Sequence, residues 1–195
     1  MASPALPGLF FCFAACVLLV FACVSAPTWE KISFMNVDTG GSTLHFGVFG
    51  YTGSGTHVGY RFPPSLLGFE DTRLNSGVIH NLTFVLILHP IAAGLAGLAV
   101  IFGLCGAAYS RIGTIFMSIS AALATLVTLV VWVIDMVLWG LARNRINGHT
   151  GAHATYGNAN WLVLGALVSL FIGFCAGTVG ICGRYRNRRT AANTY

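Results

Sequence analysis

Charged side chains are scarce in this chain: they make up 8% of its 195 residues, and only five of them are acidic. Soluble domains carry about 25% charged residues, so the composition excludes an ordinary soluble protein. Hydrophobic residues reach 56% and the mean hydropathy is +0.79, which predicts an integral membrane protein. We interpret the net charge of +5 as a sign of membrane topology and expect no nucleic-acid partner.

Cysteine is missing from every polar segment, so no disulfide can hold a domain outside the membrane. Cys105 and Cys182 lie near the predicted inner boundary, where palmitoylation and simple burial both remain open. The sequence also lacks a cysteine cluster with zinc-ligand spacing, a nucleophile–base set and a phosphate-binding loop. We therefore expect no catalytic residue, metal or cofactor, and one intramembrane Asp with one His are too few to line a conduction path.

Four hydrophobic segments are long enough to span a bilayer, which takes about 20 helical residues. They cover residues 8–26, 82–108, 113–141 and 161–183. The first could instead be a cleaved signal peptide ending at Ala26. We expect it to be retained, because no basic residue precedes it and Pro27 would follow the cut.

Basic residues orient the chain. Four arginines follow the fourth span within six residues: Arg184, Arg186, Arg188 and Arg189. The positive-inside rule places such a cluster in the cytosol. We therefore predict both termini and a tail at 184–195 in the cytoplasm, with extracellular loops at 27–81 and 142–160.

The first outer loop has strand and turn patterns. Residues 31–37 and 43–50 read as strands, and 57–62 could return as a third. Residues 65–80 suggest a short helix, whereas 142–160 is polar, rich in glycine and predicted to be loop. The expected fold is an all-α integral membrane protein, a four-helix bundle with a small extracellular antiparallel β-sheet.

Asp135 is the only carboxylate within the predicted spans, and His89 is the only other ionisable group besides cysteine. Counting along the helices places both about 9–10 Å below the outer boundary, so they could pair. Pro90 cannot donate to the carbonyl of Leu86, which we expect to join the same polar pocket. We interpret the pair as a buried clip that docks two helices, with a proton-sensitive switch as the alternative.

Small residues mark two helix faces. In the third span Ala121, Ala124 and Thr128 share the face of Asp135, which should point into the bundle. The fourth span repeats small residues at every fourth position, which indicates close helix packing within or between chains: Gly165, Ser169, Gly173 and Gly177. We expect three tryptophans to form an aromatic belt at the outer boundary: Trp29, Trp139 and Trp161.

Five of the six histidines fall in or beside the outer segments: His45, His57, His80, His149 and His153. A histidine in water loses its proton near pH 6.5, so external acidity would change the charge of this surface. Enrichment by chance remains the alternative interpretation. His149 and His153 lie four apart in a glycine-rich segment, which is a weak metal motif, and we predict no metal there.

Three segments resemble the fungal PalI family, a tetraspan group that also includes the eisosome tetraspan proteins. They are His89-Pro-Ile-Ala-Ala-Gly-Leu95, Val133-Ile-Asp-Met-Val-Leu-Trp-Gly-Leu-Ala-Arg-Asn-Arg-Ile146 and Tyr156-Gly-Asn-Ala-Asn-Trp-Leu-Val-Leu-Gly-Ala166. The outer loop also resembles the claudin-like pattern, with Trp29 followed by Gly47-Val-Phe-Gly-Tyr51 but without its cysteine pair.

The resemblance implies a multi-pass plasma-membrane protein of the ambient-pH signalling machinery. Members of this family are thought to help a larger polytopic pH sensor reach or stay at the membrane. The alternative implied by the same group is a structural organiser of plasma-membrane microdomains. Expected partners are membrane lipid, the polytopic sensor and, as an open possibility, a second copy of this chain.

Overall fold

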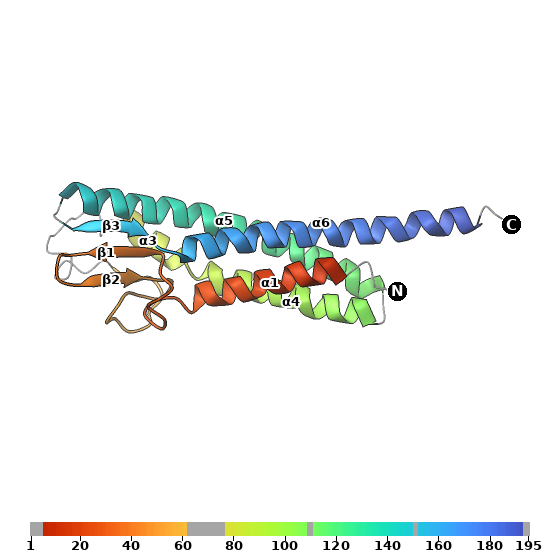
Figure 1. The fold of residues 1–195 in the computed structure, drawn as a ribbon, viewed down its shortest axis with the longest axis horizontal. Coiled ribbons are helices and arrows are strands. Elements are labelled where there is room, and N and C mark those ends of the chain that lie inside the picture. Colours follow the sequence, from red (N-terminus) through yellow and green to blue (C-terminus); the bar gives the residue numbers. More distant parts are fainter. Residues whose placement is uncertain (1–5, 62–76, 109–110, 150–151, 193–195) are drawn as a thin grey trace.

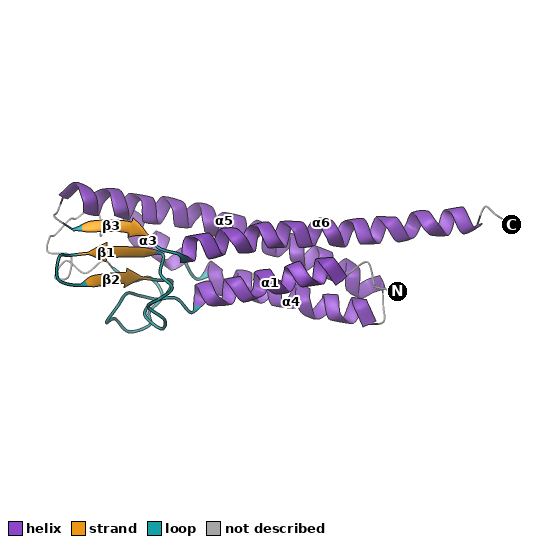
Figure 2. Ribbon diagram, in the orientation of Figure 1, coloured by secondary structure: helices purple, strands orange, loops and turns teal. Residues whose placement is uncertain are grey.

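The computed structural model describes residues 6–61, 77–108, 111–149 and 152–192. Four long helices run side by side, and a small sheet closes one end of the bundle (Figures 1 and 2). The long helices are α1 (Leu6–Cys23), α4 (Leu88–Ala108), α5 (Arg111–His149) and α6 (Ala159–Ala192), and a short helix α3 (Gly77–Val85) precedes α4. The predicted four-helix membrane bundle with a small antiparallel sheet is confirmed.

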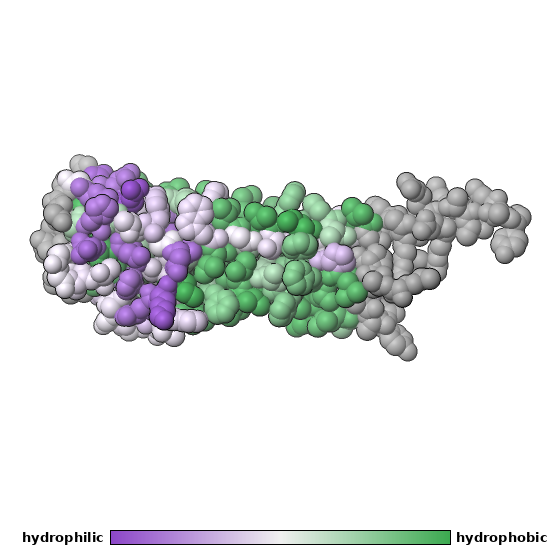
Figure 3. Space-filling view, in the orientation of Figure 1, coloured by the Kyte–Doolittle hydropathy of each residue, from purple (hydrophilic) through white to green (hydrophobic). Residues whose placement is uncertain are grey.

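Each long helix contacts two neighbours, so the four form a ring in the order α4, α5, α6, α1. Stretches apolar enough to cross a membrane cover Leu6–Cys23, His80–Gly106, Ile112–Gly148 and Ala159–Val179. On the face shown in Figure 3, hydrophobic residues cover the middle of the bundle and polar residues gather over the sheet. Helix α1 begins and α6 ends at the end opposite the sheet (Figure 1).

The sheet has three antiparallel strands in the order β2-β1-β3. Strand β1 (Met35–Asp38) lies between β2 (Thr43–Phe46) and β3 (His153–Tyr156), so that Met35 pairs with Phe46 on one side and Tyr156 on the other. The predicted third strand at 57–62 is wrong within the described residues 57–61. Those residues instead turn the side chain of Tyr60 into the core, and β3 takes the place beside β1.

Segment 142–160 was predicted to be loop, and this is also wrong. Helix α5 continues to His149, β3 follows, and α6 begins at Ala159. Ala142 and Ile146 continue a buried apolar stripe that begins at Trp139, at helical spacing, and the polar residues between them hid this pattern in the sequence. Most of the short helix predicted at 65–80 lies outside the described residues, which include its end from Gly77 onward.

The aromatic belt is corrected in one position. Trp29 and Trp161 are 44% and 69% exposed, as residues at a membrane surface can be. Trp139 is 0% exposed and stacks on Phe34, with ring centroids 5.9 Å apart. Trp139 is therefore part of the core that joins the sheet to the helices.

Candidate functional site

A break between α3 and α4 positions His89. Helix α3 ends at Val85, a turn follows, and α4 begins at Leu88 with Pro90 in its first turn. Pro90 has no N–H and is tolerated there, whereas it would disrupt the middle of a helix. The carbonyl of Leu86 is free of the usual helical bond, and it lies 3.1 Å from the backbone nitrogen and 3.0 Å from Nδ1 of His89.

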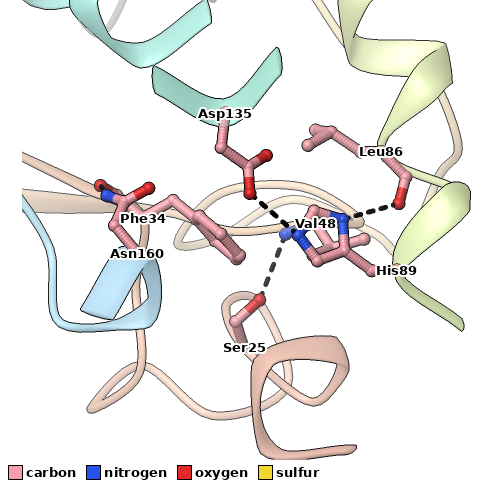
Figure 4. Close-up of polar contacts among 7 residues, drawn as sticks. All are labelled: Ser25, Phe34, Val48, Leu86, His89, Asp135 and Asn160. Atoms are coloured by element: carbon pink, nitrogen blue, oxygen red, sulfur yellow. Dashed lines mark hydrogen bonds and ion pairs between the residues drawn. The ribbon is translucent and has the colours of Figure 1, made fainter. Parts of the chain in front are cut away.

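Asp135 reaches this ring from the facing helix. Nε2 of His89 lies 3.1 Å from Oδ2 of Asp135, and both side chains are 0% exposed (Figure 4). The small face of α5 points the same way, because Ala121, Ala124 and Thr128 are also fully buried. The structure thus brings together the three groups expected from the sequence: the imidazole, the carboxyl group and the Leu86 carbonyl.

The segment that follows α1, residues 25–61, covers the pair and is called the covering loop below. The ring of Phe34 meets the ring of His89 edge to face, with centroids 5.2 Å apart. Val48 lies beside it, and its N–H donates to Oγ of Ser25, two residues after the end of α1, over 3.1 Å (Figure 4). Phe34, Val48 and Ser25 are at most 1% exposed, so the pair is sealed from solvent.

The start of α6 holds this covering loop in place. Oδ1 of Asn158 accepts a hydrogen bond from the N–H of Ser33 at 3.0 Å, and Nδ2 of Asn158 donates to the carbonyl of Lys31 at 2.8 Å. Asn160 donates to the carbonyl of Phe34 at 2.8 Å. Gly157 permits this contact, because a Cβ there would lie 1.9 Å from the carbonyl oxygen of Ser33.

Sequence reasoning missed these three residues as parts of the site. A signal was available, because Gly157, Asn158 and Asn160 lie within the third segment that resembles the PalI family. Their partners are about 125 residues away in the chain, as in the bonds from Ser33 to Asn158 and from Asn160 to Phe34. Spacing along the sequence could not reveal such pairings.

Tyr60 completes the polar surroundings of Asp135. Its hydroxyl donates to the carbonyl of Gly47 at 2.8 Å, and its own carbonyl accepts from Thr83 at 3.0 Å. Burial, and secondarily the charge of Asp135, raises the pKa of the Tyr60 phenol well above its usual 10. Tyr60 therefore remains neutral at physiological pH.

The small stripe of α6 lies against α1 and α5. A Cβ on Gly173 would lie 3.0 Å from Sγ of Cys12, and one on Gly177 would lie 3.0 Å from Oγ of Ser118. Gly165 faces Leu18, and Ser169 is half-buried. These contacts are within the chain, and packing between chains stays a prediction.

The outward histidines occupy different environments. His57 and His153 are exposed, while His45 is half-buried, with Nδ1 2.8 Å from Oδ1 of Asn36. His80 is half-buried beside the ring of Phe84, and the side chain of His149 lies outside the described residues. A shallow depression of about 440 Å³ lies beside His45, lined by Glu30, Lys31, Ser33, Asn36, His45, Tyr156, Gly157 and Asn158.

The His89–Asp135 pair can hold a proton between its two side chains, and it connects two helices. Within the described residues no group of three His, Cys, Asp or Glu side chains could hold a metal ion. The pair His89–Asp135 joins α4 to α5 and contacts the covering loop through Phe34.

Comparisons with known proteins agree with this architecture. The model of the SUR7/PalI family matches residues 4–173, which include all four long helices in part or whole. The pH-response regulator protein palI/RIM9 of Emericella nidulans is 34% identical over 100 residues, or 48% of this chain. The match covers 18% of that protein, so this chain corresponds to a minor part of the relative's length. With a family match over most of its length, the chain belongs to the SUR7/PalI family.

Proposed function

We propose that this chain is a non-enzymatic accessory protein of ambient-pH signalling that assists a polytopic pH sensor in the plasma membrane. The observation that carries the proposal is the similarity to the palI/RIM9 pH-response regulator within a matching family. The accessory role, the sensor and the plasma membrane are our inferences from that similarity.

The His89–Asp135 pair supports this role, because it is an ionisable pair within the bundle that contacts the covering loop, which lies outside the hydrophobic middle of the bundle. His89 and Asp135 are sealed beneath the loop that leads into β1, and that loop is bonded to the start of α6. A change in the protonation or position of the pair would therefore affect the packing of α4, α5, α6 and the sheet. Such a link suits a protein whose output is the shape it presents to a membrane partner.

The proposed orientation places both termini in the cytoplasm and the sheet outside. Its basis is the arginine cluster after the fourth span, at the end of the bundle opposite the sheet (Figure 1). In that orientation the exposed His57 and His153 face the external medium. Fusing a pH-sensitive fluorescent protein to the C-terminus, and testing whether it follows cytoplasmic or external pH, checks the orientation.

A second candidate function is structural organisation of membrane microdomains. It is favoured by the shared SUR7/PalI family model and by the lipid-facing apolar side chains around the bundle, such as Phe10 and Phe171. This alternative predicts stable cortical patches and normal growth at alkaline pH.

A deletion strain carrying tagged variants separates the two candidates. The accessory role predicts poor growth at alkaline pH on deletion, rescue by the wild-type chain, and crosslinking of the chain to a polytopic protein in native membranes. Asp135→Ala should fail to rescue, whereas Gly94→Ala, a change into open space on α4, should rescue fully. Normal alkaline growth of the deletion strain together with lost patches would instead support the organiser.

A further inference from the structure

Two contacts of His89 determine how many protons the buried pair holds. Nδ1 lies 3.0 Å from the carbonyl of Leu86, and a carbonyl can only accept, so Nδ1 carries a hydrogen. Nε2 lies 3.1 Å from Oδ2 of Asp135. Two lone pairs repel at that distance, so a proton must lie between these atoms, bonded either to Nε2 or to Oδ2.

Both arrangements give the pair the same charge. A protonated imidazole beside a carboxylate, and a neutral imidazole beside a carboxylic acid, each sum to zero and each hold one shared proton. We propose that His89 and Asp135 form a proton-loaded latch, and that loss of the shared proton at alkaline pH releases the covering loop, residues 25–61, from the bundle. The relevance of this latch to signalling rests on the function proposed above. The presence of one shared proton in the pair rests on the geometry alone.

The surroundings make loss of the proton costly in the closed structure. The titratable group that faces the pair from the covering loop is the neutral phenol of Tyr60, which donates to Gly47. The covering loop also contributes Ser25, Phe34 and Val48, and α6 contributes Asn160; none of these side chains titrates (Figure 4). Among the described residues no donor reaches Oδ1 of Asp135. Deprotonation would therefore leave a buried charge opposite a lone pair, with nothing to compensate it.

Opening the loop would relieve that cost by admitting water. Phe34 is in contact with His89, so water reaches the pair only if this part of the loop moves. A histidine in water loses its proton near pH 6.5, so above this pH the open state binds fewer protons than the closed state. The closed state is then weakened as pH rises, by up to about tenfold per pH unit for one proton. Below about pH 6.5 both states hold the proton, so the equilibrium between the closed and open states does not change with pH. This holds over the pH range in which the carboxyl group of the open state stays ionised.

Hydrogen exchange on the purified full-length chain in lipid nanodiscs tests the latch. Corrected for intrinsic rates, protection of amides in residues 25–61 should fall by up to about tenfold per unit between about pH 6.5 and pH 9. In Asp135→Asn the amide donates to Nε2 without a titrating proton, so protection should stay level. Tyr60→Phe and His57→Gln should keep the wild-type dependence, because neither group holds the shared proton.

A second measurement needs no variant. The protein is labelled at histidine nitrogens and aspartate carboxyl carbons and studied by nuclear magnetic resonance at about pH 7.5, where exposed histidines are mostly neutral. The spectra should show one protonated imidazole or one protonated carboxyl group. Neutral imidazoles beside fully ionised carboxylates would overturn the proposal, as would level wild-type protection or an Asp135→Asn variant that keeps the wild-type dependence. The latch behaving as expected in a chain whose deletion leaves alkaline growth normal would reject the signalling role and keep the latch.

Discussion

The sheet end and the membrane half of this molecule differ in where their large aromatic side chains lie. Beneath the sheet the core includes large, fully buried aromatic side chains, namely Phe34, Phe46 and Trp139. In the membrane half the buried side chains are mostly alanine, with a few larger residues such as Leu19 and Met117. Large aromatic residues there point outward instead: Phe10 is 65% exposed and Phe171 is 57% exposed.

The difference follows from the two solvents. Outside the membrane, burying a large apolar side chain removes it from water and stabilises the fold. In lipid that gain is absent, and helices are held by close backbone approach between small residues. The pair His89–Asp135 lies where the two kinds of packing meet, touching Phe34 on one side and the small face of α5 on the other.

The largest expected effect comes from emptying the core beneath the sheet. Phe34→Ala should lower the free energy of unfolding by about 3–5 kcal/mol, because Phe34 is fully buried between His89 and Trp139. The matched control Phe171→Ala, at a lipid-facing position, should change it little. Unfolding in mixed detergent micelles measures both, and equal losses would contradict the difference between the two halves.

A methyl group added between helices should have the next largest effect. A Cβ on Gly113 would lie 2.6 Å from backbone atoms of Gly106, so Gly113→Ala must move α5 away from α4. We expect a loss of about 1–3 kcal/mol. The same change at Gly94 meets open space and should be neutral or stabilising by up to about 1 kcal/mol. If the two substitutions gave the same thermal midpoint, close approach would not be what holds the membrane half.

The outer edge of β3 should show a smaller effect. Asn147 on α5 accepts from the N–H of Ala154 at 2.7 Å and donates to its carbonyl at 3.2 Å. Asn147→Ala removes both bonds at an exposed position, so we expect a loss of about 1–2 kcal/mol and more aggregation through the freed edge of β3. Light scattering and thermal unfolding measure this, with the exposed neighbour Asn144→Ala as control.

The smallest expected effect is at Tyr60. Because folding raises the pKa of its phenol, the associated stability is complete below the unfolded value of about 10 and is lost only as pH rises through the folded value. Tyr60→Phe should therefore cost at most about 1 kcal/mol, the worth of its bond to Gly47, and leave the stability profile between about pH 6 and pH 9 unchanged. An altered profile in this range would show that Tyr60 titrates with the buried pair.

Much of the membrane half could be predicted from the sequence, because hydrophobic length and helical period are local properties. The contact between His89 and Asp135 could be predicted by counting residues along two helices that follow one another closely in the sequence. The burial of Ala121, Ala124 and Thr128 follows from the same helical period, and the structure confirms it.

The sheet end could not be predicted as fully, because its pairings are not local. The third strand comes from residues 153–156, far along the chain from β1, and the polar surface of α5 beyond Leu141 masked its buried stripe. The sequence predicted that Pro90 would leave the carbonyl of Leu86 without its helical bond, but it did not predict that a turn would separate α3 from α4. The actual break depends on the turn at Leu86, whose carbonyl is bonded to His89.

A double-mutant cycle on His89 and Asp135 tests the central claim most directly. The free energy of unfolding is measured near pH 6.5 for the wild type, His89→Ala, Asp135→Ala and the double variant. If the two side chains form one buried unit, each single change leaves an unsatisfied partner, and the coupling energy should be about 1–3 kcal/mol. Additive losses, with a coupling energy of zero within about 0.3 kcal/mol, would show that the two residues do not act together.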